Sequence, residues 1–163
     1  MDSNIQIKHC LKDDLLVGQD IDLIKAVAAI ESQVQPLDAW DSQSINQLLS
    51  QDINQLLVAM MGEVIMGYCL YQQLFEQGEI LRIGTHPSYR RQGIASRLLK
   101  VLFDRLKVED VERLLLEVRA DNAPAIALYE RHSFEIIHRR KGYYQAANQP
   151  AMDALIMAYD VQR

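Results

Sequence analysis

Three consecutive leucines in the C-terminal half constrain the fold more than any other feature. Leu114-Leu115-Leu116 lies inside the apolar segment 111–118. Because neighbouring side chains of a strand point to opposite faces of its sheet, this run needs apolar cover on both faces. Segments with helical periodicity stand on either side of it, as they do around strands that pair in parallel. The sequence therefore predicts an α/β protein whose central sheet is covered on both faces.

Hydrophobic periodicity gives the order of the remaining elements. Continuous or alternating apolar segments predict strands, whereas apolar residues three and four positions apart predict helices. The expected order is strand, two helices, three strands, helix, strand, helix and two strands. Strands are expected at 5–10, 56–61, 64–74, 79–85, 111–118, 134–137 and 154–158, and helices at 20–33, 42–49, 94–106 and 123–131. With no linker or low-complexity segment between them, residues 1–163 are expected to form a single domain.

The charges are divided unevenly along the chain. Residues 1–81 hold 12 acidic and 3 basic side chains, and residues 82–163 hold 10 acidic and 14 basic ones. This division suits an acidic region that attracts a cationic substrate and a basic region that binds an anionic cofactor, although an ordinary protein surface can show the same split. The net charge of −5 disfavours direct nucleic-acid binding.

The N-terminus and the cysteines indicate where the protein works. The chain begins Met1-Asp2-Ser3-Asn4, without a basic region or an apolar signal core. Its richest apolar stretch, Leu56–Met61, is far shorter than the ~20 residues of a membrane span. Cys10 and Cys69 are expected to be free thiols, and no His or Cys pattern has the spacing of metal ligands. We therefore expect a cytoplasmic protein without a membrane span or a metal site.

A glycine-containing segment between a predicted strand and a predicted helix is suited to binding an anion. It reads Arg90-Arg91-Gln92-Gly93-Ile94-Ala95. Gly93 and Ala95 leave room for a ligand near the backbone, and the unpaired N–H groups of a helix N-terminus favour negative charge. The segment matches neither the Walker loop nor the dinucleotide-binding fingerprint. A simple turn before a helix is the alternative interpretation.

The residues around this loop resemble those of a known enzyme family. The segment Glu79–Ala95 is similar to the acetyl-coenzyme A (acetyl-CoA) binding motif of the GNAT N-acetyltransferases, whose pattern Arg/Gln-x-x-Gly-x-Gly/Ala is matched by Arg90, Gly93 and Ala95. The segments 116–122 and 125–130 resemble the branch that acetylates the N-terminal alanine of a small-subunit ribosomal protein. The resemblance implies the GNAT fold, a mixed sheet of about six to seven strands that splays between the fourth and fifth, with about four helices.

The resemblance also implies a role for individual residues. Glu117 would be the general base and Tyr129 the general acid for acetyl transfer to an amine, and we expect both to face the gap between the fourth and fifth strands from the same side. Acetyl-CoA is the implied co-substrate and a ribosomal protein N-terminus the implied partner of a monomer or weak dimer. The implied coenzyme contacts are Ile83, Gly84, Thr85, Arg90, Arg91, Gln92, Gly93, Ile94, Ala95, Ser96 and Asn122, and the implied acceptor contacts are Trp40, Tyr143 and Tyr144.

The three residues central to this mechanism also have purely structural interpretations. A carboxylate after three leucines is costly to bury without a partner, so Glu117 could instead pair with Arg119 or Arg113. Tyr129 could pack in the core with its hydroxyl bonded, and Asn122 could cap the helix that follows it.

Two positions depart from the pattern of that branch. Gly84-Thr85 stands where the branch has Ala-Val, and Ser133 stands where the family has glycine. Serine is strained in a left-handed helix cap, so the helix before it is expected to end differently. Tyr143-Tyr144 is expected in the loop before the last strand, where the two residues could line the acceptor groove or close a hairpin as half-exposed aromatics. Trp40 could belong to the core instead of the acceptor pocket. The charged segment 138–141 could contact the coenzyme phosphates or the ribosomal protein, or could face solvent.

The protonation of the acceptor distinguishes possible substrates. An α-amine with a pKa of about 8 costs roughly 1.4 kcal/mol to deprotonate at pH 7, whereas a lysine with a pKa of about 10.4 costs roughly 4.6 kcal/mol. One carboxylate is sufficient for the first, which favours a protein N-terminus. A lysine side chain, a small-molecule amine and a coenzyme-binding module without turnover are the alternatives.

Overall fold

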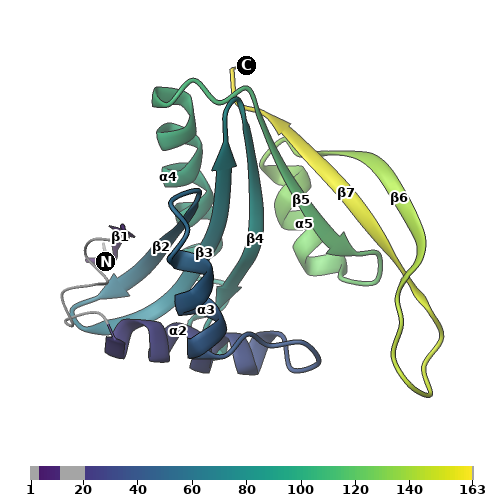
Figure 1. Ribbon diagram of the computed structural model, residues 1–163, viewed down its shortest axis with the longest axis horizontal. Helices are drawn as coiled ribbons and strands as arrows, with labels where there is room; N and C mark the ends of the chain where they lie inside the picture. Colours follow the sequence, from purple (N-terminus) through teal and green to yellow (C-terminus); the bar gives the residue numbers. More distant parts are fainter. Residues whose placement is uncertain (1–3, 12–20, 163) are drawn as a thin grey trace.

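Seven strands and four helices make up the described part of the chain, residues 4–11 and 21–162, in this computed structural model (Figure 1). The strands are β1 (Gln6–Cys10), β2 (Asn54–Met61), β3 (Val64–Leu74), β4 (Gln77–Thr85), β5 (Arg113–Arg119), β6 (Glu135–Tyr144) and β7 (Met152–Asp160). The helices are α2 (Ile21–Val34), α3 (Ser42–Leu49), α4 (Ile94–Val108) and α5 (Ala123–Arg131), and the 3₁₀ turn η1 (Pro87–Tyr89) precedes α4. The order confirms the predicted one, and Asp20, the expected start of the first helix, lies outside the described residues.

The strands form one mixed sheet in the order β1-β2-β3-β4-β5-β7-β6. Neighbouring strands run antiparallel except β4 and β5, which run parallel. Leu114-Leu115-Leu116 is part of β5, so the prediction of a parallel central strand is confirmed. Within residues 4–11 and 21–162, no helix is long and apolar enough to cross a membrane.

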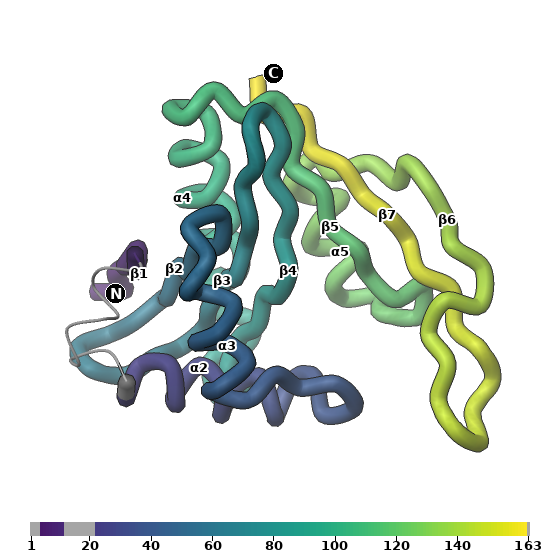
Figure 2. The backbone as a smooth tube through the Cα atoms, viewed as in Figure 1, coloured from purple at the N-terminus to yellow at the C-terminus, as the bar shows by residue number. Residues whose placement is uncertain are grey.

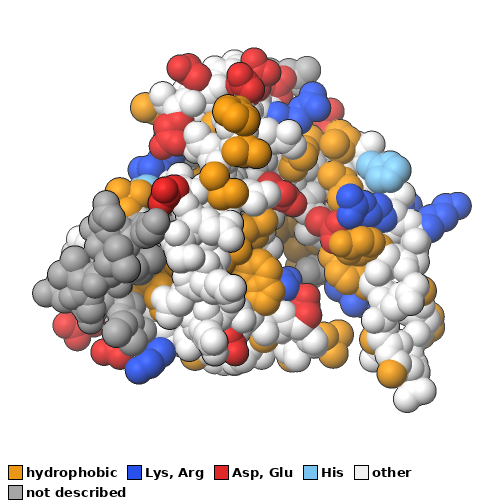
Figure 3. Space-filling model, in the orientation of Figure 1, with side chains coloured by type: hydrophobic (Ala, Val, Ile, Leu, Met, Phe, Trp, Pro, Cys, Tyr) orange, Lys and Arg blue, Asp and Glu red, His pale blue; other side chains and the backbone are white. Residues whose placement is uncertain are grey.

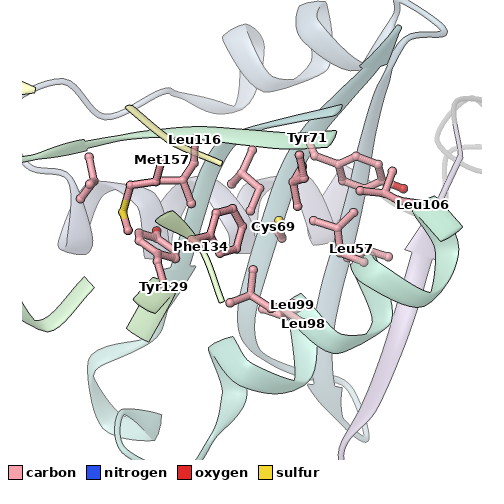
Figure 4. Close-up of a cluster of buried hydrophobic side chains, with 14 of the residues drawn as sticks. Leu57, Cys69, Tyr71, Leu98, Leu99, Leu106, Leu116, Tyr129, Phe134 and Met157 are labelled. Carbon is pink, nitrogen blue, oxygen red and sulfur yellow. The ribbon is translucent and has the colours of Figure 1, made fainter. Parts of the chain in front are cut away.

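Alternating side chains of the inner strands contribute to two separate cores. Leu57 and Cys69 point into a first core, which α4 and α5 cover, whereas Leu56 and Tyr68 point into a second core, which α2 and α3 cover. Figure 4 shows the first core, where leucines of α4 meet side chains from the sheet. Helices therefore cover both faces of the sheet at β2 and β3. At β5 only the face of Leu114 and Leu116 is buried, in the first core, whereas Leu115 is partly exposed and belongs to neither core, so the expectation of apolar cover on both faces of this strand is wrong.

β4 and β5 separate after a short paired stretch. Their pairing runs from Gln77 with Arg113 to Ile80 with Leu116 and ends there, although both strands continue (Figure 2). A bulge at Leu81, which has no partner on β3, bends β4 at this point. β5 pairs with β7 along its full length instead. The predicted splay between the fourth and fifth strands is confirmed.

Two glycines allow close packing next to this gap. A Cβ atom on Gly67 would lie 2.8 Å from both the Gly84 carbonyl oxygen and Cγ2 of Ile94, the first residue of α4. A Cβ atom on Gly84 would lie 2.7 Å from the ring of Tyr68. The departure from the branch pattern at position 84 is therefore explained by the tyrosine beside it. Gly67 lets the start of α4 lie directly against the sheet.

Replacing Gly67 with alanine should lower the free energy of unfolding by about 1–3 kcal/mol, because overpacking against backbone cannot be relieved by rotating a side chain. The matched control is Gly78→Ala on β4, where the added Cβ would meet the flexible end of the Leu114 side chain at 3.2 Å. Urea denaturation should show a loss below about 1 kcal/mol for the control. Equal losses in the two variants would contradict this account of the packing.

Candidate active site

A cavity of about 790 Å³ lies where β4 and β5 diverge. Its walls come from β4, β5 and α5, from the segment 34–38 at the end of α2, and from residues of the segment 144–152 between β6 and β7. Figure 3 shows this hollow between the two halves of the sheet, with acidic and basic side chains on its rim. A cavity with mixed charge beside unpaired strand backbone suits a polar ligand.

Glu117 lies on β5 just beyond the last residue that pairs with β4. Its side chain is 23% exposed, and both carboxylate oxygens have partners. The Tyr144 hydroxyl donates to Oε1 at 2.9 Å, and Nη1 of Arg140 lies 3.2 Å from Oε2. The alternative prediction that Glu117 pairs with Arg119 or Arg113 is therefore wrong. Arg119 forms an ion pair with Asp121 instead. Burial and the bond to the carboxylate raise the pKa of Tyr144, which keeps its phenol a donor.

Tyr129 projects from α5 into the first core (Figure 4). Its ring packs against Phe134, with 5.6 Å between the ring centroids, in the same core as Leu116 and Met157. The residue also lines the cavity, and among the described residues its hydroxyl has no hydrogen-bond partner. Burial raises the pKa of Tyr129, so the phenol is protonated at neutral pH.

Glu117 and Tyr129 reach the cavity from opposite faces of the sheet. Side chains alternate along β5, and Leu116 and Val118 point into the core that contains Tyr129. Glu117, between them, points to the other face. The expectation that both residues face the gap from one side is therefore wrong. They line one cavity because the diverging strands leave it open to both faces.

The loop before α4 has the backbone of an anion-binding site. Arg91 and Gly93 both adopt left-handed conformations, with φ of 64° and 76°. The backbone bond from the Arg97 N–H to the Gly93 carbonyl, 3.0 Å long, opens α4, and among the described residues no side chain caps the helix. The N–H groups of the first turn are therefore available to a ligand such as a diphosphate, with Arg90 exposed at the start of the same loop.

The cavity brings together five of the predicted site residues, namely Ile83, Glu117, Asn122, Tyr129 and Tyr144. The other predicted coenzyme residues, at 84–85 and 90–96, continue from β4 into α4 outside its lining. Asn122 fits both of its interpretations, since it lines the cavity and also caps α5 by accepting from the Ala125 N–H at 3.3 Å. In the part of the chain that the structure describes, no three His, Cys, Asp or Glu side chains cluster as a metal site.

Trp40 and Tyr143 do not line the cavity. The Trp40 ring lies against the Arg82 guanidinium, 4.5 Å from the ring centroid, and packs against the second core. Tyr143 is half exposed beside Arg140, whose guanidinium is 5.1 Å from its ring centroid. The prediction of a loop at Tyr143-Tyr144 is wrong because both residues belong to β6, where alternation turns only Tyr144 toward the cavity.

Two polar residues of this region were missed by sequence reasoning. Arg82 interrupts the apolar strand segment 80–83, and a charge at such a position is the signal that could have found it. Arg140 lies in the charged segment 138–141, where no pattern distinguishes one member from another.

Comparison with known proteins relates the chain to one family. A family model described as acetyltransferase (GNAT) family matches residues 24–134. The ribosomal protein bS18-alanine N-acetyltransferase of Escherichia coli strain K12 is 38% identical over 94 residues, which cover 58% of this chain and 63% of that relative. The aligned part thus spans less than two thirds of that relative's length. The N-alpha-acetyltransferase RimI of Mycobacterium tuberculosis is 34% identical over 119 residues, which cover 70% of this chain and 73% of that relative.

Solved structures show the same fold. The crystal structure of the ribosomal-protein-S18-alanine N-acetyltransferase from Escherichia coli matches with a TM-score of 0.82 and 27% identity, covering 96% of this chain and 94% of that one. Arabidopsis thaliana NAA60 in complex with acetyl-CoA matches in fold, with a TM-score of 0.79 and 19% identity over 98% of this chain and 100% of that one. By its family match, its relatives and its fold, the chain belongs to the GNAT acetyltransferase family.

Proposed function

We propose that this chain is an acetyl-CoA-dependent N-acetyltransferase that modifies the N-terminal alanine of a small-subunit ribosomal protein. One observation carries the proposal: a carboxylate and a free phenol, Glu117 and Tyr129, line a single cavity from opposite faces where β4 and β5 separate. The acceptor is supported by the relative whose name specifies ribosomal protein bS18 and alanine.

The residues present suit acetyl-CoA, which when bound supplies the acetyl group as a thioester. The backbone of β4 from Leu81 to Thr85 is unpaired on the side of β5, so it can pair with the pantetheine arm as an added strand would. The first turn of α4, with Arg90 and Arg91, suits the diphosphate. An N–H group of the same part of β4 is available to the acetyl carbonyl oxygen, where negative charge develops during the reaction.

Glu117 is the proton acceptor in the proposed reaction. The amine nitrogen forms a bond to the acetyl carbon as the carbon–sulfur bond breaks, and the amine proton passes to the Glu117 carboxylate, directly or through water. Tyr144 and Arg140 hold one carboxylate oxygen each and so fix its orientation. The acceptor side of the reaction therefore lies on the face that carries Glu117.

Tyr129 is proposed to act on the thioester sulfur from the other face of the sheet. Full proton transfer from an ordinary tyrosine, pKa about 10, to a thiolate whose thiol has a pKa of about 8.5 is uphill by about 2 kcal/mol. Burial raises the pKa of Tyr129 further, which makes that transfer harder still. We therefore infer that the hydroxyl acts first as a hydrogen-bond donor that stabilises the departing thiolate.

The test is thiol release from acetyl-CoA with a panel of amines. The panel holds a peptide that starts with alanine, a lysine-containing peptide with a blocked N-terminus, and a polyamine. We expect the alanine peptide to react at least about tenfold faster than the others, since its amine is the cheapest to deprotonate. Preference for the blocked lysine peptide or the polyamine would replace the proposed acceptor. Coenzyme binding without thiol release in any mixture would indicate a binding module.

A further inference from the structure

The guanidinium of Arg82 joins three elements at the edge of the cavity. From β4 it reaches α2, where its Nε lies 3.3 Å from Oε1 of Glu31. Its Nη2 lies 2.9 Å from Oδ2 of Asp38 and donates to the Asp38 carbonyl at 3.2 Å. Asp38 belongs to the segment 35–38, which forms one wall of the cavity.

The buried Glu31 carboxylate requires the ion pair with Arg82. The Glu31 side chain is 1% exposed, and an ionised carboxylate buried to that degree needs a cation. The Tyr68 hydroxyl donates to its other oxygen, Oε2, and the Trp40 N–H lies 3.5 Å from Oε1. Burial, together with the nearby Glu31 charge, raises the pKa of Tyr68, so that phenol stays a donor. Gly84 leaves the space that the Tyr68 ring occupies.

The segment 35–38 itself has little backbone support. The Gln35 N–H donates to the Glu31 carbonyl at 2.8 Å, and the Asp38 N–H donates to the Gln35 carbonyl at 3.2 Å. Leu37 is 70% exposed, so packing does not hold the segment either. A short connection with few bonds of its own depends on side-chain contacts for its position. Those contacts come from Arg82, which also stacks on Trp40 at the far end of the loop.

We propose that Arg82 is a positioning residue that holds the segment 35–38 as a wall of the acceptor subsite, so that acceptor binding depends on the Arg82–Asp38 pair. This inference rests on the proposed function, because it takes the cavity beside Glu117 as the place of the amine. The Arg82 guanidinium then has two separate roles. The ion pair with Glu31 serves stability, and the hydrogen bonds to Asp38 serve acceptor binding.

Two variants test the role of Arg82 in acceptor binding separately from its role in stability. Asp38→Asn removes the loop's charge but leaves the buried pair of Glu31 and Arg82 intact. The double variant Glu31→Gln/Arg82→Met removes both members of the buried ion pair and, with them, the contact to Asp38, without leaving an unpaired buried charge. Both should raise the KM for the acceptor peptide about 3- to 10-fold while kcat and the KM for acetyl-CoA stay within about twofold. The control is Arg105→Met, which breaks an ion pair with Glu109 on α4, away from the cavity.

A second readout needs no turnover. Trp40 is the sole tryptophan of the chain, so acrylamide quenching of its fluorescence reports on the loop directly. We expect both variants to be quenched about twofold more than the wild type and the Arg105→Met control. Unchanged quenching would overturn the inference, even with a raised KM, because Asp38 would then contact the acceptor itself. Raised quenching with an unchanged acceptor KM would also overturn it. If the wild type acetylates no amine, the proposed function fails, and quenching still decides whether Arg82 holds the segment.

Discussion

Replacing Glu117 with glutamine should lower kcat/KM for the acceptor by about 10²- to 10⁴-fold, the usual contribution of a general base. Glutamine has the same shape, and its amide oxygen can still accept from the Tyr144 hydroxyl, but it cannot take up a proton. Glu117 belongs neither to the β4 backbone nor to the loop before α4, the two parts proposed to hold acetyl-CoA, so the affinity for acetyl-CoA should stay within about twofold. Stability should change by less than about 1 kcal/mol, because the ion pair with Arg140 is partly exposed.

The pH dependence identifies the role more sharply than the size of the loss. Without a base, only the free amine reacts, so the rate of the variant should fall about tenfold per pH unit below the amine pKa of about 8. The wild type can bind the protonated amine and move its proton to Glu117, so its rate should fall less steeply. The ratio of the two rates should therefore grow as the pH is lowered.

The matched control for this experiment is Glu109→Gln. Glu109 also pairs with an arginine, Arg105, at 3.3 Å, but it lies on the far end of α4 and does not line the cavity. Its rate should match the wild type at every pH. A ratio between Glu117→Gln and the wild type that stays constant across the pH range would remove Glu117 from the role of base.

Elements with local signals are predictable from the sequence. Asp41 caps α3, with its side chain accepting from the Ser44 N–H at 2.8 Å, and an aspartate directly before a helical pattern is a local signal for such a cap. Pro124 stands in the first turn of α5, where its missing N–H costs nothing. The leucine run identifies β5 as a strand, of which the face of Leu114 and Leu116 is buried. Each of these signals involves residues within a few positions of one another, so no tertiary information is needed to interpret them.

β6 shows where local patterns fail. The sequence predicts a strand at 134–137, whereas the strand runs from Glu135 to Tyr144. β6 is an edge strand with most side chains exposed, so its charged residues show no alternation of polar and apolar positions. The pairing with β7 extends it instead, supported by the ion pair of Arg139 with Asp153 at 2.6 Å.

The expectation that Ser133 changes the end of α5 is wrong. It adopts the left-handed conformation, with φ of 65°, that a glycine would take after α5, so the helix does not end differently. Its N–H donates to the Glu130 carbonyl at 3.0 Å. The next residue, Phe134, is buried against Tyr129 and Phe103. Burial of a phenylalanine contributes about 1.5–3 kcal/mol, which exceeds the strain of roughly 1 kcal/mol at the serine.

The two parts of the candidate site differ in how far the sequence determines them. The loop 90–96 is a contiguous motif, and its backbone follows from Gly93 and from the helix that begins after it. The environment of Glu117 depends on partners that lie 23 and 27 positions further along the chain, Arg140 and Tyr144. The same limit applies to Arg82 and Asp38, which are 44 positions apart. Such contacts are set by strand register and by the sheet as a whole, which no local pattern encodes.

Replacing Tyr129 with phenylalanine should lower kcat by about 10²-fold, the effect of removing one hydrogen-bond donor from a developing negative charge. The fold should tolerate the change, because phenylalanine fills the same space against Phe134 and no described residue accepts a bond from the lost hydroxyl. The free energy of unfolding should therefore change by less than about 1 kcal/mol. The matched control is Tyr159→Phe, whose ring stacks on Phe103 in the same aromatic group, 4.1 Å between centroids, but does not line this cavity.

The alkaline side of the pH profile tests the same residue without a mutation. Tyr129 must be protonated to donate, and burial raises its pKa above the ordinary value of about 10, so the donor is lost only at a pH above that value. Wild-type kcat should consequently show no decline from this group up to about pH 10. A decline below pH 9 that disappears in Tyr129→Phe would contradict the raised pKa. Wild-type turnover in Tyr129→Phe at every pH would assign the residue to packing alone, and the departing thiolate would then need a different donor.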